Sequence, residues 1–343
     1  MTDSQAVQET GEPVGRATTA PVTDLLAVGQ LFLDVLYGPL PSAPVLGQEL
    51  FTERVSLVPG GIANFAVAAT ALGAQAEIAA PVGNGPLSAL TRSLLVESEI
   101  GTDALDVHEG WDLQLTTALS YGGDRALVTA GLPSSGQHGA PRGLGRAASV
   151  AVHLELGDMP WLAGAPGRIY ADVGWDPSGV WDRAMLRHLA HCHAFLPNAD
   201  EARAYTRTDS PRAAARALAE LVPLAVVTCG ADGVIAIDSA TGSEMEVRAV
   251  ALGPVDPTGA GDTFGAALIV LLDRGLTLRA AAEAASLAAT ARAAGVVGPA
   301  RTPTLLQLAD LARHHRLDCA EALAALGGPS PTPARGSAAF PVR

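Results

Sequence analysis

The stretch Asp256-Pro257-Thr258-Gly259-Ala260-Gly261-Asp262-Thr263-Phe264 decides the expected fold of this 343-residue chain. An apolar run begins at Phe264 with the spacing of a buried helix, and it stops at Arg274-Gly275. A basic residue followed by glycine is a common way to end a helix. We therefore predict a helix that starts at Gly259-Ala260-Gly261 and continues to about residue 274.

The amino end of this helix is suited to binding an anion. Small residues let backbone N–H groups point at one place, and the helix dipole is positive there. Asp262 falls in the first turn, where the dipole favours its carboxylate form. Such a carboxylate can take a proton from an alcohol while the N–H groups hold the group being attacked. The structural alternative is a glycine-rich turn with an aspartate helix cap.

The composition excludes several other classes of protein. All 22 basic residues are arginine, and the chain contains no lysine. It therefore has no P-loop lysine, no protein-kinase strand lysine and no Schiff-base lysine. The formal net charge of −13 argues against a protein that binds nucleic acid.

No segment has the pattern of a membrane or secretory protein. The apolar runs are shorter than the roughly 20 residues that a spanning helix needs, and the first 20 residues lack the apolar core of a signal peptide. The 3 cysteines are widely spaced and form no disulfide framework. We expect a cytoplasmic protein that binds no membrane.

Short apolar runs alternate with alanine-rich helical runs over most of the chain. We predict strands at 25–36, 76–83, 149–156, 168–173, 194–198 and 225–230, and helices at 62–74 and 86–98. This alternation is typical of βαβ units and of a mostly parallel sheet covered on both faces. Residues 37–58 and 107–130 break the rhythm and have hairpin-like patterns, which predicts a small lid sheet.

The two ends of the chain differ from the middle in composition. Residues 1–20 are polar and unpatterned, and residues 328–343 are rich in Pro, Ser and Gly. Such segments cannot bury enough apolar surface to fold, so we expect two disordered tails. One folded domain would then cover residues 21–327.

The segment 256–268, DPTGAGDTFGAAL, resembles the C-terminal signature of the ribokinase-like (PfkB) carbohydrate kinase family. Other motifs of that family occur in its order over roughly residues 24–300. They are Asp34 after Gly29, Gly60-Gly61-Ile62-Ala63-Asn64 with Leu72-Gly73 and Gly83, Asn198-Ala199-Asp200-Glu201, and Thr228-Cys229-Gly230-Ala231-Asp232-Gly233.

The resemblance implies a three-layer α/β/α Rossmann-like domain with a small β lid over the substrate. It also implies ATP-dependent phosphorylation of a hydroxymethyl group on a sugar or sugar-like alcohol. Mg²⁺ would assist, and no lysine is required. A nucleoside kinase of the same fold and a non-catalytic sugar or nucleotide sensor are the alternatives. The partner is then a small molecule, and a homodimer could form through the lid.

The family's functional residues can be carried onto matching positions of this chain. Asp262 would be the general base, with Gly259, Ala260 and Gly261 as the anion hole. Substrate hydroxyls would be held by Asp34, Gly61 and Asn64, and ATP by Asn198, Thr228, Gly230 and Gly233. Glu201 would hold Mg²⁺ through water, and Asp256 is a candidate ligand for a monovalent cation such as K⁺.

Some positions depart from the family pattern. Two residues separate the Gly pair from Asn64, where most members have three. The segment 172–176 falls where several relatives have Asp-x-Asn-x-Arg, and here both the Asn and the Arg are missing. His153 and Glu155 share one face of an expected strand. They are expected either to contact substrate or a cation, or to have an ordinary place in the core or on the surface.

The acceptor is expected to be neutral. A phosphorylated or acidic acceptor needs at least one arginine fork, because no lysine is available. The pocket segments 31–34, 60–64 and 172–176 contain no arginine, and they bring several aspartates. Arg54 and Arg125, in the lid segments, are the only nearby arginines expected to be able to reach an anionic acceptor.

Overall fold

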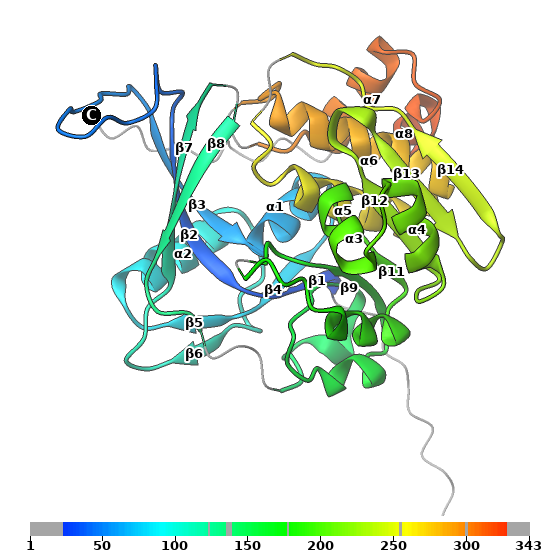
Figure 1. Ribbon diagram of the computed structural model, residues 1–343, viewed down its shortest axis with the longest axis horizontal. Helices are drawn as coiled ribbons and strands as arrows, with labels where there is room; N and C mark the ends of the chain where they lie inside the picture. Colours follow the sequence, from blue (N-terminus) through cyan, green and yellow to red (C-terminus); the bar gives the residue numbers. More distant parts are fainter. Residues whose placement is uncertain are drawn as a thin grey trace, which may run out of the picture.

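The computed structural model describes residues 23–122, 124–134, 139–176, 178–253, 256–298 and 301–327. The expected tails, 1–20 and 328–343, lie outside these residues. Helices cover both faces of an eight-stranded sheet, and a separate four-stranded sheet stands beside it (Figure 1). This arrangement agrees with the predicted three-layer α/β/α domain with a small β lid.

The main sheet has the strand order β14-β13-β12-β11-β10-β9-β1-β4. Its strands are β1 (Thr23–Val28), β4 (Ala76–Ala79), β9 (Ala147–His153), β10 (Arg168–Asp172), β11 (Ala194–Phe195), β12 (Leu224–Thr228), β13 (Val234–Asp238) and β14 (Ser243–Val247). The strands from β4 to β12 are parallel, whereas β13 is antiparallel to both of its neighbours. Parallel strands end at one edge of the sheet, and side chains from several strands can meet there.

Alternating side chains of β1 reach the two faces of the sheet. Leu25 and Ala27 join the core under α1 (Ala63–Ala71), α5 (Ala260–Asp273), α6 (Leu278–Ala293), α7 (Leu305–His314) and α8 (Ala320–Leu326). Leu26 and Val28 join a second core under α3 (Ala199–Thr206), α4 (Pro211–Ala219) and the 3₁₀ helices Leu144–Arg146, Pro160–Gly164 and Arg183–His191. Since successive strand residues point to opposite faces, an entirely apolar strand requires helices on both sides.

The second sheet is the lid, with the order β3-β2-β7-β8. Its strands are β2 (Leu31–Tyr37), β3 (Val55–Gly61), β7 (Gln114–Tyr121) and β8 (Asp124–Ala130). The two outer pairs are antiparallel, and the central pair β2–β7 is parallel. Figure 1 shows these strands at the left, with α2 (Pro86–Glu97) at the base of β3 and the short pair β5 (Pro81–Gly83) and β6 (Asp106–His108) below.

The run 25–36, predicted as one strand, is two strands in two different sheets. The chain bends at Gly29, where an added Cβ would lie 3.2 Å from both His153 and Ile62. The next carbonyl, that of Gln30, accepts the N–H of Ile62 at 2.9 Å and joins the bend to the start of α1. An apolar run without a visible break hid this glycine bend, and Asp34 consequently lies within the lid rather than at the end of a main-sheet strand.

Two further expectations about strands need correction. The predicted lid segments overlap β3, β7 and β8, but residues 38–54 form no strand and most of β2 precedes residue 37. The strand predicted at 225–230 is followed by the hairpin β13–β14 and not by a helix. Gly233 opens this hairpin with a φ of +97° in a place where a Cβ would overlap the carbonyl of Val247.

The helix predicted from the opening stretch is α5, and it packs tightly on α1. Gly265 allows this approach, because a Cβ there would overlap the ring of Phe65. At the other end of α5, Arg274 donates to the carbonyls of Leu72 and Gly73, both at 2.8 Å. None of the helices in the described part of the chain has the length and hydropathy required to span a bilayer.

Candidate active site

The amino end of α5 forms the predicted anion site. Gly259 is its N-cap residue, with a φ of +68° that favours glycine, and Asp262 lies in the first turn. The first N–H groups of a helix have no acceptor within the helix and can face a ligand. One of the predicted donors is already engaged, because the N–H of Ala260 donates to the carbonyl of Pro257 at 3.1 Å.

Asp262 meets the ends of two neighbouring strands of the main sheet. His153 ends β9 and Asp172 ends β10, and these two residues are partners in the strand register. The Nε2 atom of His153 lies 3.6 Å from Oδ1 of Asp262. One ligand atom from each of the three side chains lies within 4.8 Å of the others. Two carboxylates and one imidazole therefore converge at the carboxyl edge of the sheet.

Asp172 is fully enclosed among other acids. Burial, and then the negative charges of Glu201 and Asp262, hold the pKa of Asp172 well above its usual range. Its Oδ1 atom accepts the N–H of Val173 at 2.8 Å. A cation placed beside such a buried carboxyl would stabilise its anionic form.

Glu201 and Asn198 form a reciprocal cap at the start of α3. Asn198 Oδ1 accepts the N–H groups of Asp200 and Glu201 at 3.0 Å, and Glu201 Oε2 accepts the N–H of Asn198 at 2.9 Å. Burial raises the pKa of Glu201 to about 7, although these hydrogen bonds and His153 oppose the shift. The Asn-x-x-Glu motif is thus a capping box that also points a buried carboxyl toward Asp172 and Asp262.

The predicted acceptor residues come together from the lid and α1. Burial, and then the charge of Asp262, raise the pKa of Asp34 to about 7, while Arg292 lowers it. The Asp34 carboxylate lies against Gly60, where a Cβ would overlap it. Gly61 has a φ of +64°, and a Cβ there would overlap the carbonyl of Gln30. Gly60 therefore lets β3 pass close beside Asp34, and Gly61 lets the same strand approach the bend at Gln30.

Arg292, near the end of α6, is a residue that sequence analysis missed. It is only 6% exposed. Its Nε donates to the carbonyl of Thr258 and its Nη2 to Oδ1 of Asn64, both at 3.3 Å. A Cβ on Gly259 would lie 2.6 Å from that Nη2. Burial lowers the pKa of Arg292, whereas Asp262, Asp256 and Asp34 raise it.

A signal for Arg292 was present in the helical period. Counting back from Arg292 in steps of a helical turn reaches Ala288, Ala284 and Ala281, which are all buried. The pocket segments that resemble family motifs contain no arginine, and α6 lies outside all of these motifs. The sequence motifs did not place His153 and Asp172 together. The signal for their proximity is that they end two parallel strands that are neighbours in the sheet.

The predicted nucleotide residues lie beside the Asn198 cap. Thr228 at the end of β12 forms a parallel bridge with Asn198, and its N–H donates to the carbonyl of Pro197 at 3.1 Å. The loop then closes through the N–H of Cys229, which donates to Gly233 at 2.7 Å. Gly230 has a φ of +56° and open space around its Cα. Gly233 has a structural role already, because it starts the β13–β14 hairpin.

Asp256 joins the lid to the loop before α5. Its Oδ1 accepts the hydroxyl and the N–H of Thr258 at 2.6 and 3.0 Å, and its Oδ2 accepts the hydroxyl of Ser120 on β7 at 3.1 Å. Although burial opposes the shift, these hydrogen bonds and Arg125 lower the pKa of Asp256. The predicted cation ligand is therefore an ionised carboxylate held by hydroxyls.

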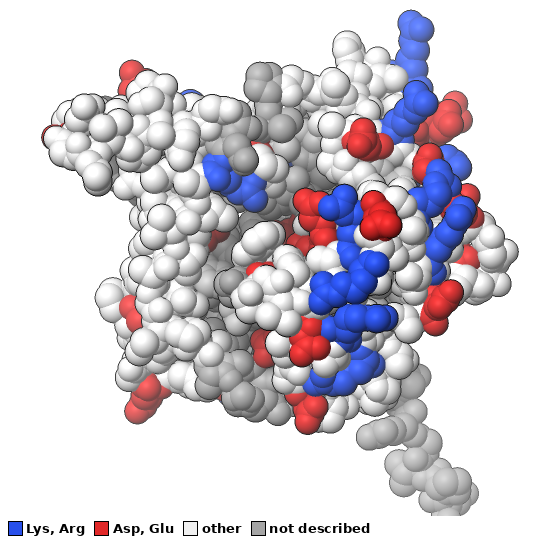
Figure 2. All heavy atoms as spheres, viewed as in Figure 1, with Lys and Arg blue, Asp and Glu red and all other residues white. Residues whose placement is uncertain are grey.

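A hollow lies between the lid and the main sheet on one face of the molecule. Figure 2 shows this hollow near the centre of the view, with acidic atoms at its margin. The arginines at the right of the same view are interleaved with acids, and ion pairs join Arg212 to Glu244 and Glu246, and Arg216 to Glu244.

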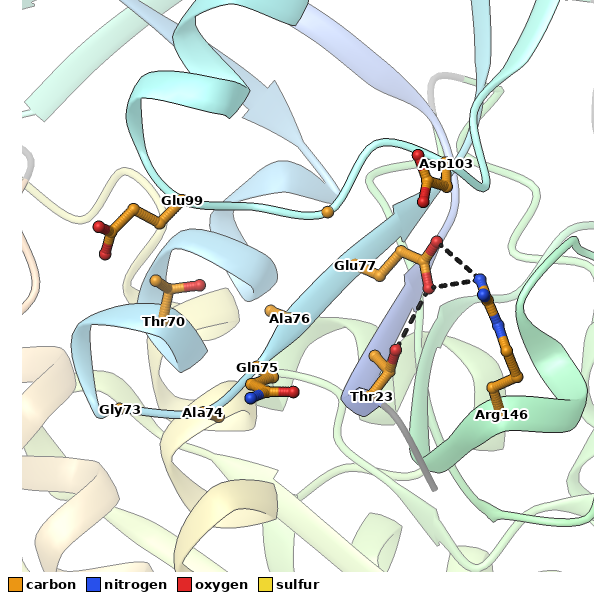
Figure 3. A pocket seen from close by; sticks show the side chains of 11 residues that line it. Thr23, Thr70, Gly73, Ala74, Gln75, Ala76, Glu77, Glu99, Asp103 and Arg146 are labelled. Carbon is orange, nitrogen blue, oxygen red and sulfur yellow. Dashed lines mark hydrogen bonds and ion pairs between the residues drawn. The ribbon is translucent and has the colours of Figure 1, made fainter. Parts of the chain in front are cut away.

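A separate cavity of about 490 Å³ opens at the opposite edge of the sheet. It lies where β1 and β4 begin, and its wall includes the buried Glu77 (Figure 3). Arg146 contacts Glu77 at 3.3 Å, and the hydroxyl of Thr23 donates to Glu77 at 3.3 Å. Its lining, as far as the chain is described, includes no predicted site residue.

Comparison with known proteins identifies the family resemblance independently. A family model described as pfkB family carbohydrate kinase matches residues 163–300. No protein of curated function matches the sequence significantly. The resemblance predicted from the sequence motifs is therefore confirmed, with the family model covering the part of the chain from β10 to the end of α6.

Several solved structures share the fold. A ribokinase from Arabidopsis thaliana, complexed with ribose and ATP, has 19% identity and a TM-score of 0.68, covering 85% of this chain and 99% of its own. A protein from E. coli provisionally assigned as ribokinase II, complexed with ATP and Mg²⁺, has 17% identity and a TM-score of 0.68, covering 86% and 100%. A nucleoside kinase from Methanocaldococcus jannaschii has 19% identity and a TM-score of 0.64, covering 87% and 100%. The fold is thus ribokinase-like.

Proposed function

We propose that the protein is an ATP-dependent kinase that phosphorylates a hydroxymethyl group of a neutral sugar or sugar-like alcohol. One observation carries this proposal above the others. Asp262 stands in the first turn of α5, beside the helix N–H groups, and faces both the acids of the main sheet and Asp34 of the lid. This is the arrangement that a general base needs if it activates an alcohol next to a phosphoryl group.

In the proposed reaction Asp262 accepts the proton of the acceptor hydroxyl. The hydroxyl oxygen then forms a bond to the γ-phosphorus of ATP, and the bond between that phosphorus and the β,γ-bridging oxygen breaks to release ADP. The N–H groups of Gly259 and Gly261, with the partly engaged Ala260, would stabilise the charge on the transferred group. Asp34, Gly61 and Asn64 would orient the acceptor so that its oxygen lies in line.

The acids around Asp262 fit a magnesium ion. Mg²⁺ prefers carboxylate and water oxygens, and Asp172 and Glu201 are buried carboxyls that a divalent cation would keep ionised. Glu201 would hold the ion through water, with Asp172 as a second holder. When bound, Mg²⁺ would neutralise charge on the nucleotide phosphates. Glu201 can hold the ion through water and still cap α3, because the capping hydrogen bond uses only its Oε2 atom.

ATP would bind on the side of Asn198 and β12. Thr228, Gly230 and Gly233 form the loop at the end of β12, and Asn198 is bridged to Thr228. Ligands of open α/β sheets commonly lie outside the carboxyl ends of the strands, which supports this location. Asn198 would contact the nucleotide with its amide nitrogen, since its oxygen caps α3.

The acceptor is proposed to be neutral even though Arg292 borders its pocket. This guanidinium already donates to Asn64 and Thr258, and three aspartates surround it. Asp172 and Glu201 add two further acidic groups beside Asp262. A negatively charged group on the acceptor would therefore meet more repulsion from these acids than attraction from Arg292.

A monovalent cation such as K⁺ remains a candidate at Asp256, whose carboxylate is ionised and held by hydroxyls. We further propose one kinase domain over residues 21–327, with a lid that closes over the acceptor. The exposed apolar side chains of Leu57 and Val128 share one register row and one face of the lid, and they support a homodimer through this sheet.

Two alternatives make different predictions for one experiment. A nucleoside kinase of the same fold would prefer nucleosides, and a non-catalytic sensor would bind sugar or nucleotide without turnover. Measuring ADP production with ATP, Mg²⁺ and a panel of sugars and nucleosides separates the three. A preference for neutral sugars supports the proposal, preference for nucleosides supports the first alternative, and binding without turnover supports the second.

A further inference from the structure

Arg292 occupies an unusual position for an arginine in this chain. Among the described residues classed as buried, it is the one arginine, although the chain has 22. Its guanidinium lies between the acceptor residue Asn64 and the loop that begins α5. Burying a charge is costly unless it is paired, so this arginine requires a compensating reason to be there.

The hydrogen bond from Arg292 determines which way the Asn64 amide faces. An arginine side chain has donors and no acceptor, so the atom of Asn64 that faces Nη2 must be the oxygen. The amide NH₂ of Asn64 is then turned away from Arg292. An acceptor group opposite this NH₂ must accept a hydrogen bond, as a hydroxyl or ring oxygen does.

The same guanidinium lies against the N-cap of α5. A Cβ on Gly259 would be 2.6 Å from Nη2 and 3.0 Å from Nε. The positive charge is therefore fixed at the end of the helix where the dipole is also positive. An arginine stays charged at any ordinary pH, and the chain contains no lysine that could supply this charge from another position.

We propose that Arg292 is a positioning residue that orients the Asn64 amide toward the acceptor and places a fixed positive charge beside the phosphoryl site at Gly259. This inference rests on the proposed kinase function and deepens it. It assigns Arg292 a part in binding and charge stabilisation without making it a receptor for an acidic acceptor. Asn64 and the N-cap glycine Gly259 both lie close to the Nη2 atom of this guanidinium, and their two roles can be tested with different ligands.

The first test compares Arg292→Met with Arg274→Met. Arg274 also donates to two backbone partners at a helix end, but it lies at the far end of α5. We expect Arg292→Met to lower kcat about 100-fold, as loss of one charge-stabilising donor does in other enzymes, and also to raise the acceptor KM. Arg274→Met should lower the melting temperature with kcat unchanged. Equal kcat losses in both variants, or unchanged kcat and KM in Arg292→Met, would overturn the proposal.

A second test measures binding without turnover. Calorimetry with AMPPNP and with ADP, both with Mg²⁺, compares ligands that differ in the γ-phosphoryl position. Arg292→Met should weaken AMPPNP binding about 10-fold and ADP binding less, and Arg292→Lys should recover part of the AMPPNP affinity. If the wild type binds both nucleotides and the variant binds them equally well, this inference fails while the kinase proposal stands. If the wild type binds neither, the kinase proposal itself fails.

The orientation of Asn64 is tested with a double-mutant cycle. Asn64→Ala removes the amide that Arg292 holds, so the acceptor KM effects of Asn64→Ala and Arg292→Met should not add. Asn64→Asp keeps a partner for Arg292 but has no NH₂ to offer the acceptor. It should raise the acceptor KM and leave AMPPNP affinity near that of the wild type. Additive KM effects, or a normal acceptor KM in Asn64→Asp, would contradict the orienting role.

Discussion

At the scale of single residues, the site is a group of carboxyls whose ionisation depends on their neighbours. Burial, and then the negative charge of Asp262, shift the pKa values of Asp34, Asp172 and Glu201 toward the protonated form. Asp262 lies among them at the positive end of α5. Its position makes it the residue whose chemistry can be tested most simply.

We expect Asp262→Asn to lower kcat by about 10²- to 10⁴-fold, because the asparagine cannot accept the hydroxyl proton. Asparagine has nearly the same shape, so the fold and ATP affinity should change little. Steady-state kinetics and calorimetry with AMPPNP measure the two quantities. A variant that keeps at least half of the wild-type kcat would contradict the assignment of Asp262 as base.

The pKa of Asp34 predicts how stability depends on pH. Because the pKa is raised from 3.8 to about 7 in the folded protein, the unfolded chain holds fewer protons between these values. The free energy of unfolding should therefore fall as pH rises from about 4 to about 7. Asp34→Asn should flatten this fall in denaturant titrations of the nucleotide-free protein. Asp209→Asn, in an exposed loop, is the control, and identical slopes in wild type and Asp34→Asn would refute the prediction.

Single residues could be predicted from the sequence where one contiguous segment contains both the signal for a helix start and the proposed catalytic side chain. Gly259 and Asp262 lie within three residues of each other, so the helix start and the base could be located together. Arg292 could not be found in this way, since its partner Asn64 is 228 positions away in the chain. Which residues face a pocket from a distant helix depends on packing, and one sequence contains little information about it.

At the scale of elements, the start of α3 combines a cap and a candidate metal ligand. Glu201→Gln keeps a carbonyl oxygen for the N–H of Asn198 but removes the negative charge. We expect strict Mg²⁺ dependence in the wild type and a higher Mg²⁺ requirement in this variant, with a smaller change in acceptor KM. Magnesium titrations at saturating ATP measure the effect, and an unchanged titration would count against Glu201 as a holder of the ion.

The control for this prediction is Glu201→Ala, which removes both functions. Losing the reciprocal cap should cost about 0.5–2 kcal/mol of stability, whereas Glu201→Gln should cost less. Denaturant unfolding of the two variants distinguishes the cap from the charge. Equal stability losses would mean that the buried carboxylate, and not the capping bond, supports the start of α3.

The lid is the element whose movement can be measured. Ser120 on β7 already bonds Asp256 beside the anion site, so the sheet has a contact from which to close. Hydrogen exchange should show added protection in β2, β3, β7 and β8 when a sugar acceptor and AMPPNP are both bound, because closure excludes water from phosphoryl transfer. The β13–β14 hairpin, at the other edge of the main sheet, serves as the reference. Unchanged exchange throughout the lid would contradict closure.

Element boundaries show which sequence signals were reliable. The helices predicted at 62–74 and 86–98 correspond to α1 and α2 within a few residues, since the glycine that follows α1 and the proline that begins α2 are local signals. The strand predicted at 25–36 was wrong as one element, because Gly29 sends two apolar runs into different sheets. The sheet that β2 joins after the bend is determined by its pairing with β3 and β7, which lie far away in the sequence.

At the scale of the whole molecule, the fold brings five separate segments to one edge of the main sheet. The lid contributes Asp34, the strand ends contribute His153 and Asp172, α3 contributes Glu201, and α5 contributes Asp262. The order of the motifs along the chain predicted the ribokinase-like fold, because the motifs resemble those of one family and occur in the same order. The identity of the acceptor could not be read in the same way, since it depends on the combined charge and shape of all these segments.

The most direct test of the central claim is a comparison of acceptors at saturating ATP and Mg²⁺. Values of kcat/KM for neutral hexoses, pentoses and nucleosides should be measured beside fructose 1-phosphate, fructose 6-phosphate and 2-keto-3-deoxygluconate, with Asp262→Asn as the control for each. We predict that a neutral sugar or sugar-like alcohol gives the highest value, and that this activity is lost in the variant. The highest kcat/KM with any of the three anions, or turnover that survives in Asp262→Asn, would contradict the account.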